Sequence, residues 1–190
     1  MLKQCSVERL RHGLVSRRDG LIVVAMRYYP RGLKKELRDE YDSFLAPSAE
    51  LLRDFNRHQA ESGHEVAFVQ SRYEDRFELG ARARARLEEL ARQSRSRDVY
   101  LTCQCGMGQR CHREILLLLA RALYGARIDK VYHAYPRALA RLAAAREEPA
   151  APPRRPIVND GSGDDRRGGS GGVRRPDPRR RRSRTEPRRR

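Results

Sequence analysis

The sequence predicts an α/β fold, namely a three-layer Rossmann-like domain with a small, mostly parallel sheet, followed by a disordered basic tail. Two continuous apolar runs, Leu21 to Met26 and Val99 to Thr102, have the length and residue types of strands that are covered on both faces. An apolar helix follows the second run after a glycine-containing turn, which is how a parallel strand–helix unit begins. Residues 149–190 contain almost nothing apolar. We therefore predict one domain over residues 1–148 and a tail over residues 149–190.

The first part of the chain predicts one strand and then helices. Residues 1–20 mix charged residues with glycines and indicate no clear element. Pro30 ends the first strand, because proline lacks a backbone donor. Apolar residues at helical spacing predict a helix over Leu33–Leu45 and, after Ser48 as its N-cap, a further helix from Ala49 to about Phe55.

The second part of the chain predicts more helices around the second strand. The segment from about Glu65 to Gln93 is rich in helix-forming residues and is interrupted near Gly80. A helix apolar nearly all round follows the second strand over Glu114 to Leu123. Lys130 to Tyr135 predicts a third strand, which would close a right-handed strand–helix–strand unit. Pro136 to Arg146 predicts a short helix.

Composition restricts the partners and the cellular compartment. The 190 residues carry 42 Lys and Arg against 25 Asp and Glu, a formal net charge of +17. This excess favours an anionic partner, either an anionic small molecule or a nucleic acid. Cysteines are few, and most of them cluster in one turn, which argues against a secreted disulfide framework and favours a reducing cytoplasm. No apolar stretch is long enough for a signal peptide or a membrane span, so we expect a soluble cytoplasmic protein without membrane contact.

The predicted tail has two interpretations. The runs Arg179–Arg182 and Arg188–Arg190 would neutralise phosphates and give salt-sensitive, sequence-independent nucleic-acid binding. Alternatively, the tail only keeps an arginine-rich protein in solution. It contains no aromatic residue on which a base would stack. The tail alone therefore predicts no base recognition.

Thiol chemistry is expected in the turn between the second strand and its helix. Cys103 ends the strand, and Cys111, His112 and Arg113 stand at the start of the helix. Positive charge and the free N–H groups of a helix N-terminus stabilise a thiolate, which makes Cys103 or Cys111 a candidate nucleophile. His112 is then the candidate general acid or base. The spacing from cysteine to arginine does not match a cysteine phosphatase loop, so we exclude that enzyme class.

The same turn is predicted to bind an anion. Backbone donors at the helix start and the guanidinium of Arg113 favour a negatively charged ligand. Arg27 and Arg31 follow the first strand, and the carboxyl ends of parallel strands share one edge of a sheet. If the two strands are neighbours, Arg27 and Arg31 complete a cationic pocket. The alternative is that both are ordinary surface arginines.

A metal site and a purely structural role are the alternatives to thiol chemistry. Three sulfurs and a nitrogen, the ligand set of a tetrahedral zinc site, are supplied by Cys103, Cys105, Cys111 and His112. Against zinc, an adjacent cysteine and histidine at a helix start rarely point at one ion. In the structural alternative, the cysteines are small buried hydrophobic residues. We therefore predict no required cofactor, with zinc as the ion that the metal alternative would bind.

Four segments together resemble the bacterial and archaeal DUF488 family, a domain-of-unknown-function family: RYYPRGLKKE at 27–36, FLAPSAELLRDF at 44–55, RYEDRFEL at 72–79 and TCQCGMGQRCHREIL at 102–116. The resemblance covers about residues 21–124 and implies a compact α/β fold. By position, it implies that family features fall on Arg27, Pro30, Arg31, Cys103, Cys111, His112 and Arg113. Cys105 lies at a more variable position, which weakens any role that needs all three sulfurs of the turn.

Two functions follow from these observations. The first is an enzyme with a thiol- and arginine-lined anion site that acts on a phosphate- or nucleotide-like substrate. The second is a non-enzymatic nucleic-acid-binding module with a structural Cys/His metal site. The sequence indicates neither the substrate nor the oligomeric state, and it does not decide which cysteine reacts.

Overall fold

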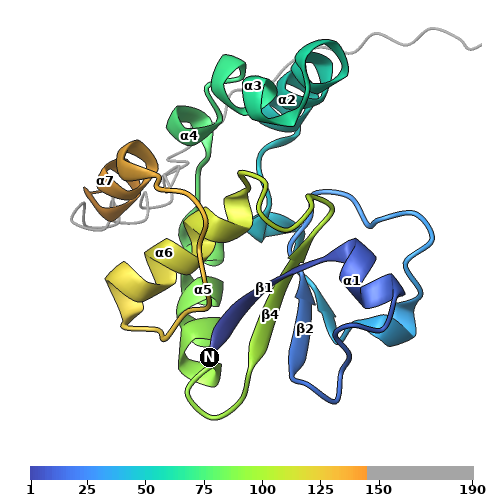
Figure 1. The fold of residues 1–190 in the computed structure, drawn as a ribbon. Coiled ribbons are helices and arrows are strands. Elements are labelled where there is room, and N and C mark those ends of the chain that lie inside the picture. Colours follow the sequence, from blue (N-terminus) through green and yellow to red (C-terminus); the bar gives the residue numbers. More distant parts are fainter. Residues whose placement is uncertain (145–190) are drawn as a thin grey trace, which may run out of the picture. The chain divides into compact units, whose positions relative to one another are not determined.

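A four-stranded, all-parallel sheet forms the centre of the molecule in the computed structural model, which describes residues 1–144 (Figure 1). The strands are β1 (Leu2–Ser6), β2 (Leu21–Val24), β3 (Glu40–Tyr41) and β4 (Val99–Cys103), and their order across the sheet is β1-β4-β2-β3. Helices flank the sheet, so the predicted α/β class is confirmed. The predicted domain boundary after residue 148 and the predicted disordered tail lie outside the described residues. Within residues 1–144, no helix is both long enough and apolar enough to span a bilayer.

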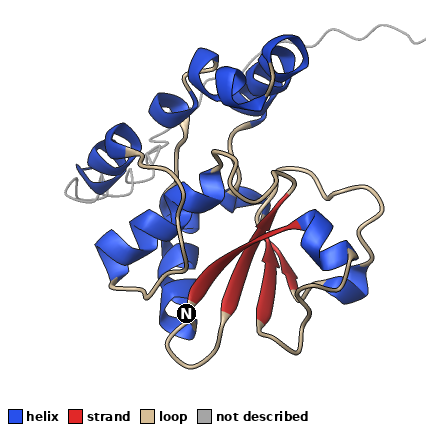
Figure 2. Ribbon diagram, viewed as in Figure 1, coloured by secondary structure: helices blue, strands red, loops and turns tan. Residues whose placement is uncertain are grey.

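Both faces of the sheet are buried, as the continuous apolar runs predicted. Alternate residues of β2 point to opposite faces, so Leu21 and Val23 join one core cluster and Ile22 and Val24 join the other. The larger cluster contains the apolar faces of α5 (Ala81–Gln93) and α6 (His112–Tyr124). The smaller cluster contains α1 (Val7–Arg11), and Figure 2 shows α1 on the side of the sheet away from α5 and α6. Three layers result from this arrangement.

The register of the parallel strands brings their carboxyl ends to one edge. In this register Val24 of β2 is the partner of Thr102 in β4, and Ser6 of β1 is the partner of Cys103. The amide of Ala25 continues the ladder and donates to the Thr102 carbonyl over 2.9 Å. The backbone that leaves β2 therefore runs directly beside Cys103.

The remaining helices lie beyond that edge or beside it (Figure 1). Ser48 caps α2 (Ala49–Ser62), as predicted, because its hydroxyl accepts the Leu51 amide over 3.1 Å. The later helices are α3 (His64–Gln70), α4 (Tyr73–Arg76) and α7 (Pro136–Ala144). The helix predicted to end near Phe55 therefore continues to Ser62, and the helical segment predicted over 65–93 is divided into α3, α4 and α5.

The predicted third strand over Lys130–Tyr135 is wrong. On the side of β4 away from β2, the neighbouring strand is β1, from the segment in which no element was predicted. Ile128 makes only an isolated bridge to Leu2, and the backbone then leaves the sheet because the following residues turn toward a buried carboxyl group on α6. The Pro136 helix is present through Ala144, the last described residue.

The helix predicted over Leu33–Leu45 is also wrong. This segment forms two short 3₁₀ turns, η1 (Lys35–Leu37) and η2 (Ser43–Leu45), with β3 between them. The amides of Asp39 and Asp42 donate to carbonyls of β2 over 3.0 and 2.9 Å. Pairing with an open sheet edge satisfies these backbone groups, so the helical spacing of the apolar side chains does not decide the structure.

Candidate active site

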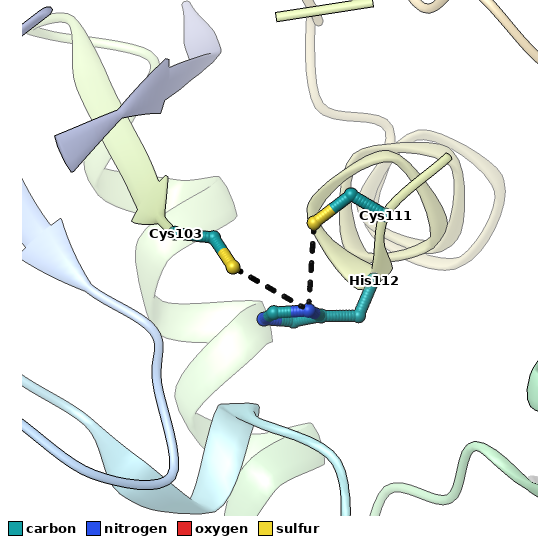
Figure 3. A group of neighbouring side chains, drawn as sticks. All are labelled: Cys103, Cys111 and His112. Carbon is teal, nitrogen blue, oxygen red and sulfur yellow. Dashed lines mark hydrogen bonds between the residues drawn. The ribbon is translucent and has the colours of Figure 1, made fainter. Parts of the chain in front are cut away.

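The connection from β4 to α6 brings three reactive side chains together. Cys103 is the last residue of β4, Cys111 is the N-cap of α6, and His112 is the first helical residue. All three side chains are buried, and Figure 3 shows both sulfurs directed at the same ring nitrogen of His112. The cluster lies at the carboxyl edge of the sheet, where open α/β folds place their ligands.

Hydrogen-bond partners determine how the His112 ring is oriented. Its Nε2 lies 2.7 Å from the carbonyl oxygen of Ala25, which can only accept, so Nε2 carries a hydrogen. Its Nδ1 faces the sulfurs, 3.5 Å from Cys111 Sγ and 4.0 Å from Cys103 Sγ. The hydroxyl of Tyr73 also lies 3.5 Å from Nδ1. The strand-end carbonyl of Ala25 thus aims the second nitrogen at the thiols.

Cys105 approaches the cluster from the loop. Its Sγ lies 3.7 Å from Cys103 Sγ, and its side chain is half-buried. Hydrogen bonding to Cys103 and Cys111, together with burial, raises the pKa of Cys105 well above its ordinary value. Cys105 is therefore a neighbouring neutral thiol.

The charges around Cys111 favour its ionised form. Burial acts to raise the pKa of Cys111, but hydrogen bonds from Cys103 and Cys105 and the positive charges of His112 and Arg113 outweigh it and lower that pKa well below the ordinary value. Burial acts to lower the pKa of His112, but the negative charge of the neighbouring sulfurs outweighs it and raises that pKa well above the ordinary value. The pair has the electrostatics of a thiolate beside an imidazolium.

Arg113 holds the loop from behind the cluster. Its side chain is fully buried, and its guanidinium donates to the carbonyl of Cys5 and, over 3.0 Å, to the carbonyl of Gly106. The loop is braced further by Gln109, whose Oε1 accepts the Gly106 amide over 2.6 Å. Arg113 therefore acts on Cys111 through its charge, and it does not line the cavity described next.

A cavity of about 230 Å³ opens over the cluster. Cys103, Cys105, Cys111 and His112 form one part of its wall, and a second part comes from residues between β2 and α2 and on α2, α3 and α4. The polar residues of this second part are Arg27, Asn56, Gln59 and His64, and the loop adds Gln104, Gln109 and Arg110. Among residues 1–144, no Asp or Glu lines the cavity.

The predicted anion-binding arginines have different positions. Arg27 lines the cavity, and its Nε donates to the carbonyl of Pro47 over 2.9 Å. Arg31 is exposed and does not line the cavity; its carbonyl accepts a hydrogen bond from Arg11. The structure therefore brings Arg27 to the cysteine cluster and does not bring Arg31 there. Arg113 contacts the loop between β4 and α6 through the Gly106 carbonyl.

Several wall residues were not predicted from the sequence. Arg110 is held by Glu65, with 3.3 Å between Nε and Oε2, and its guanidinium lies 5.9 Å from the ring centroid of Phe68. His64 Nε2 donates to the carbonyl of Arg110 over 2.8 Å. On α2, Asn56 shares a face with apolar wall residues, and a polar residue on such a face was the only available sequence signal.

A buried hydrogen-bond network fixes the N-cap residue. The amide of Cys111 donates to the Tyr135 hydroxyl over 3.0 Å, and that hydroxyl donates to Oε2 of Glu114 over 2.6 Å. Glu114 is fully buried and also accepts from the Tyr132 amide over 2.7 Å and from His133 Nδ1 over 2.8 Å. The segment that was predicted to be a strand thus supports the start of α6.

Comparison with known proteins identifies the family. The DUF488-N3a family model, described as the active DUF488-N3 subclade, matches residues 6–122. The chain belongs to the DUF488 family. The match begins at the last residue of β1, extends into α6, and includes the whole cysteine and histidine cluster. The resemblance predicted for this DUF488 domain is confirmed, and the match extends further toward the N-terminus than the predicted range. No curated protein and no solved structure matches the chain.

Proposed function

We propose that this DUF488 protein is an enzyme that acts on an anionic, phosphate- or nucleotide-like substrate. The observation that carries the proposal is the position of the buried Cys103, Cys111 and His112 cluster at the wall of a cavity that also presents Arg27 and Arg110. The described lining of this cavity contains two guanidinium groups and no carboxylate, which favours an anion. The description of the matching family model as an active subclade also supports an enzyme.

Cys111 is the proposed nucleophile. It is the cysteine nearer to His112 Nδ1, at 3.5 Å, and it caps the N-terminus of α6, where unpaired N–H groups favour negative charge. Its sulfur would attack the electrophilic atom of the substrate, and the bond to the leaving group would break with its electron pair going to that group. His112 would donate its Nδ1 proton to the leaving group. Water would then displace the sulfur and return a proton to His112.

The arginines have distinct proposed roles. The Nε of Arg27 is committed to Pro47, and its two terminal nitrogens have no acceptor among residues 1–144, so they are available to a substrate anion. Arg113 is proposed to stabilise the charge on Cys111 without touching the substrate, because it does not line the cavity and its two terminal nitrogens donate to the carbonyls of Cys5 and Gly106. Arg31 is not needed in this arrangement.

Alkylation kinetics test the proposal. Iodoacetamide at neutral pH, followed by peptide mass spectrometry, should modify Cys111 at least ten times faster than the buried Cys5. Inorganic phosphate should slow that modification in the unmodified protein and in Arg31→Gln, but not in Arg27→Gln. Equal rates at Cys111 and Cys5, or equal phosphate protection in both arginine variants, would contradict the proposal.

A zinc site is the second candidate, because the donor atoms have suitable spacing. Cys103 Sγ, Cys111 Sγ and His112 Nδ1 all lie within 4.8 Å of one another. A tetrahedral zinc ion would separate a sulfur and a nitrogen ligand by about 3.6 Å and two sulfurs by about 3.8 Å. The observed separations of 3.5 and 4.0 Å from sulfur to nitrogen, and of 3.7 Å from Cys103 to Cys105, are close to these values. A histidine that binds a metal through one ring nitrogen is usually oriented by a hydrogen bond from the other. The hydrogen bond from His112 Nε2 to the Ala25 carbonyl is of this kind.

Metal content distinguishes the two candidates. In the second candidate, the chain is a nucleic-acid-binding module whose cluster is structural, and elemental mass spectrometry of protein purified without chelator should give about one zinc per chain. Cys103→Ser should lose that zinc, while Cys5→Ser should retain it. Zinc-free protein with a fast-reacting Cys111 would eliminate the second candidate and leave the first.

A further inference from the structure

The cavity carries hydrogen-bonding groups that a phosphate alone does not need. Four carboxamide side chains line it, those of Asn56, Gln59, Gln104 and Gln109. Among residues 1–144, only Gln109 has a hydrogen-bond partner, the amide of Gly106, and this partner leaves its NH₂ group free. Each carboxamide offers a donor and an acceptor side by side. This pattern matches the edge of a nucleobase, which also alternates donors and acceptors.

Aromatic side chains form a planar and rigid part of the wall. The ring of Phe68 stacks on that of Tyr73 with 4.6 Å between centroids, and Phe55 meets the Tyr73 ring edge-on at 5.6 Å. These rings hold one another in place, because each packs against its neighbour. Tyr28 lines the same cavity with 63% of its surface exposed, so its ring is free to cover a planar ligand. The faces of the Tyr73 ring are covered by Phe68 and Phe77, at 4.6 and 6.2 Å between centroids, so the exposed Tyr28 ring is the one that would stack on a base.

The cationic groups lie in the same cavity as these carboxamides and rings. Arg27 has two free terminal nitrogens, and Arg110 uses only its Nε in its ion pair with Glu65. A guanidinium whose terminal nitrogens are free suits a phosphate group, because it donates two parallel hydrogen bonds. The cavity therefore combines groups for a phosphate with groups for a base.

We infer that the cavity binds a nucleotide through both its phosphate and its base. This inference rests on the proposed function, whose anionic substrate it narrows. A sugar phosphate has no base edge to pair with the carboxamides and no plane to stack on Tyr28, and an apolar anion has no polar edge to pair with the carboxamides. The volume of about 230 Å³ is smaller than the roughly 300 to 1,000 Å³ of sites for drug-sized ligands, which favours one nucleotide over a dinucleotide.

Calorimetric titration of the full chain tests the inference. The ligands are the four ribonucleoside 5′-monophosphates, their nucleosides, ribose 5-phosphate and inorganic phosphate. At least one mononucleotide should bind ten or more times tighter than both its nucleoside and ribose 5-phosphate. Asn56→Ala and Arg27→Gln should each lose at least fivefold in that affinity. Arg53→Gln should lose none, because Arg53 lies on the same helix as Asn56 but does not line the cavity.

The variants separate binding in the cavity from binding to the arginine-rich residues 179–190, whose charge would attract phosphates without any cavity. Unchanged nucleotide affinity in Asn56→Ala would overturn the inference. Equal affinity for ribose 5-phosphate and every mononucleotide would also overturn it, and phosphate protection of Cys111 would then show that the proposed function survives. Conversely, selective nucleotide binding with an unreactive Cys111 would leave the inference standing and reject the proposed nucleophile.

A single-stranded tetranucleotide of the preferred base identifies where the nucleotide comes from. Tighter binding than the mononucleotide, lost in Asn56→Ala, would assign the cavity to a nucleotide within a strand. Weaker binding would assign it to a free nucleotide. Both results keep the base and phosphate contacts that the inference requires.

Discussion

Replacing Tyr135 by Phe should weaken the protein and loosen the N-cap of α6. The Tyr135 hydroxyl accepts the Cys111 amide over 3.0 Å and donates to Glu114 over 2.6 Å, and the side chain is fully buried. Removal of the hydroxyl leaves the Cys111 amide without its acceptor and takes one donor from a buried carboxyl group. An unsatisfied buried group costs about 1 to 3 kcal/mol, so we expect the free energy of unfolding to fall by about 3 kcal/mol for the two losses together.

Urea unfolding followed by circular dichroism measures this change. Tyr132→Phe is the matched control, because Tyr132 belongs to the same segment and its side chain is exposed, and it should change stability by less than about 0.5 kcal/mol. The alkylation rate of Cys111 should also change several-fold in Tyr135→Phe and not in Tyr132→Phe. A loss below about 1 kcal/mol in Tyr135→Phe would refute the view that this network supports the site.

Two further predictions concern residues away from the cavity. Burial raises the pKa of Cys5 from 9.0 to about 11, so the unfolded chain loses this thiol proton at a lower pH than the folded chain does. The free energy of unfolding should therefore fall by about 2 kcal/mol as the pH rises from 9 to 11. The urea midpoint should fall less steeply with pH in Cys5→Ala than in the unmodified protein. Identical slopes in the two proteins would contradict this prediction. Gly20→Ala should cost about 2 kcal/mol or more, because the new methyl carbon would lie 2.3 Å from the backbone oxygen of Asp98. The thermal midpoint measures that cost, and Gly80→Ala, which meets nothing within 4 Å, is the control; equal midpoints for the two variants would disprove the clash.

The sequence predicted strands and helices correctly where the apolar pattern of a segment agrees with its burial in the structure. The apolar runs of β2 and β4 are buried on both faces, and α6 is buried nearly all round, so their composition alone indicates their structure. It failed for β1, because Lys3 and Gln4 interrupt the apolar pattern there. Gln4 is nevertheless buried, since its amide donates to the Lys130 carbonyl over 2.7 Å. A partner more than a hundred residues away cannot be read from a local pattern.

The candidate site was likewise predicted only in part from the sequence. Cys103, Cys111 and His112 could be grouped from the sequence, because a strand end and the start of the next helix are joined by one short loop. The opposite wall of the cavity comes from α2 and α3, far earlier in the chain, and no local pattern places those helices over the cysteine turn.

The residues along the chain were enough to predict an α/β domain of the DUF488 family with cysteines and a histidine grouped at the start of α6. The positions of the three arginines came from the packing of the folded chain: Arg27 lines the cavity, Arg31 is exposed, and Arg113 donates to the Gly106 carbonyl of the loop. The physical reason is that local spacing fixes which residues share one turn, whereas long-range packing of helices and strands fixes which side chains face one another across a cavity.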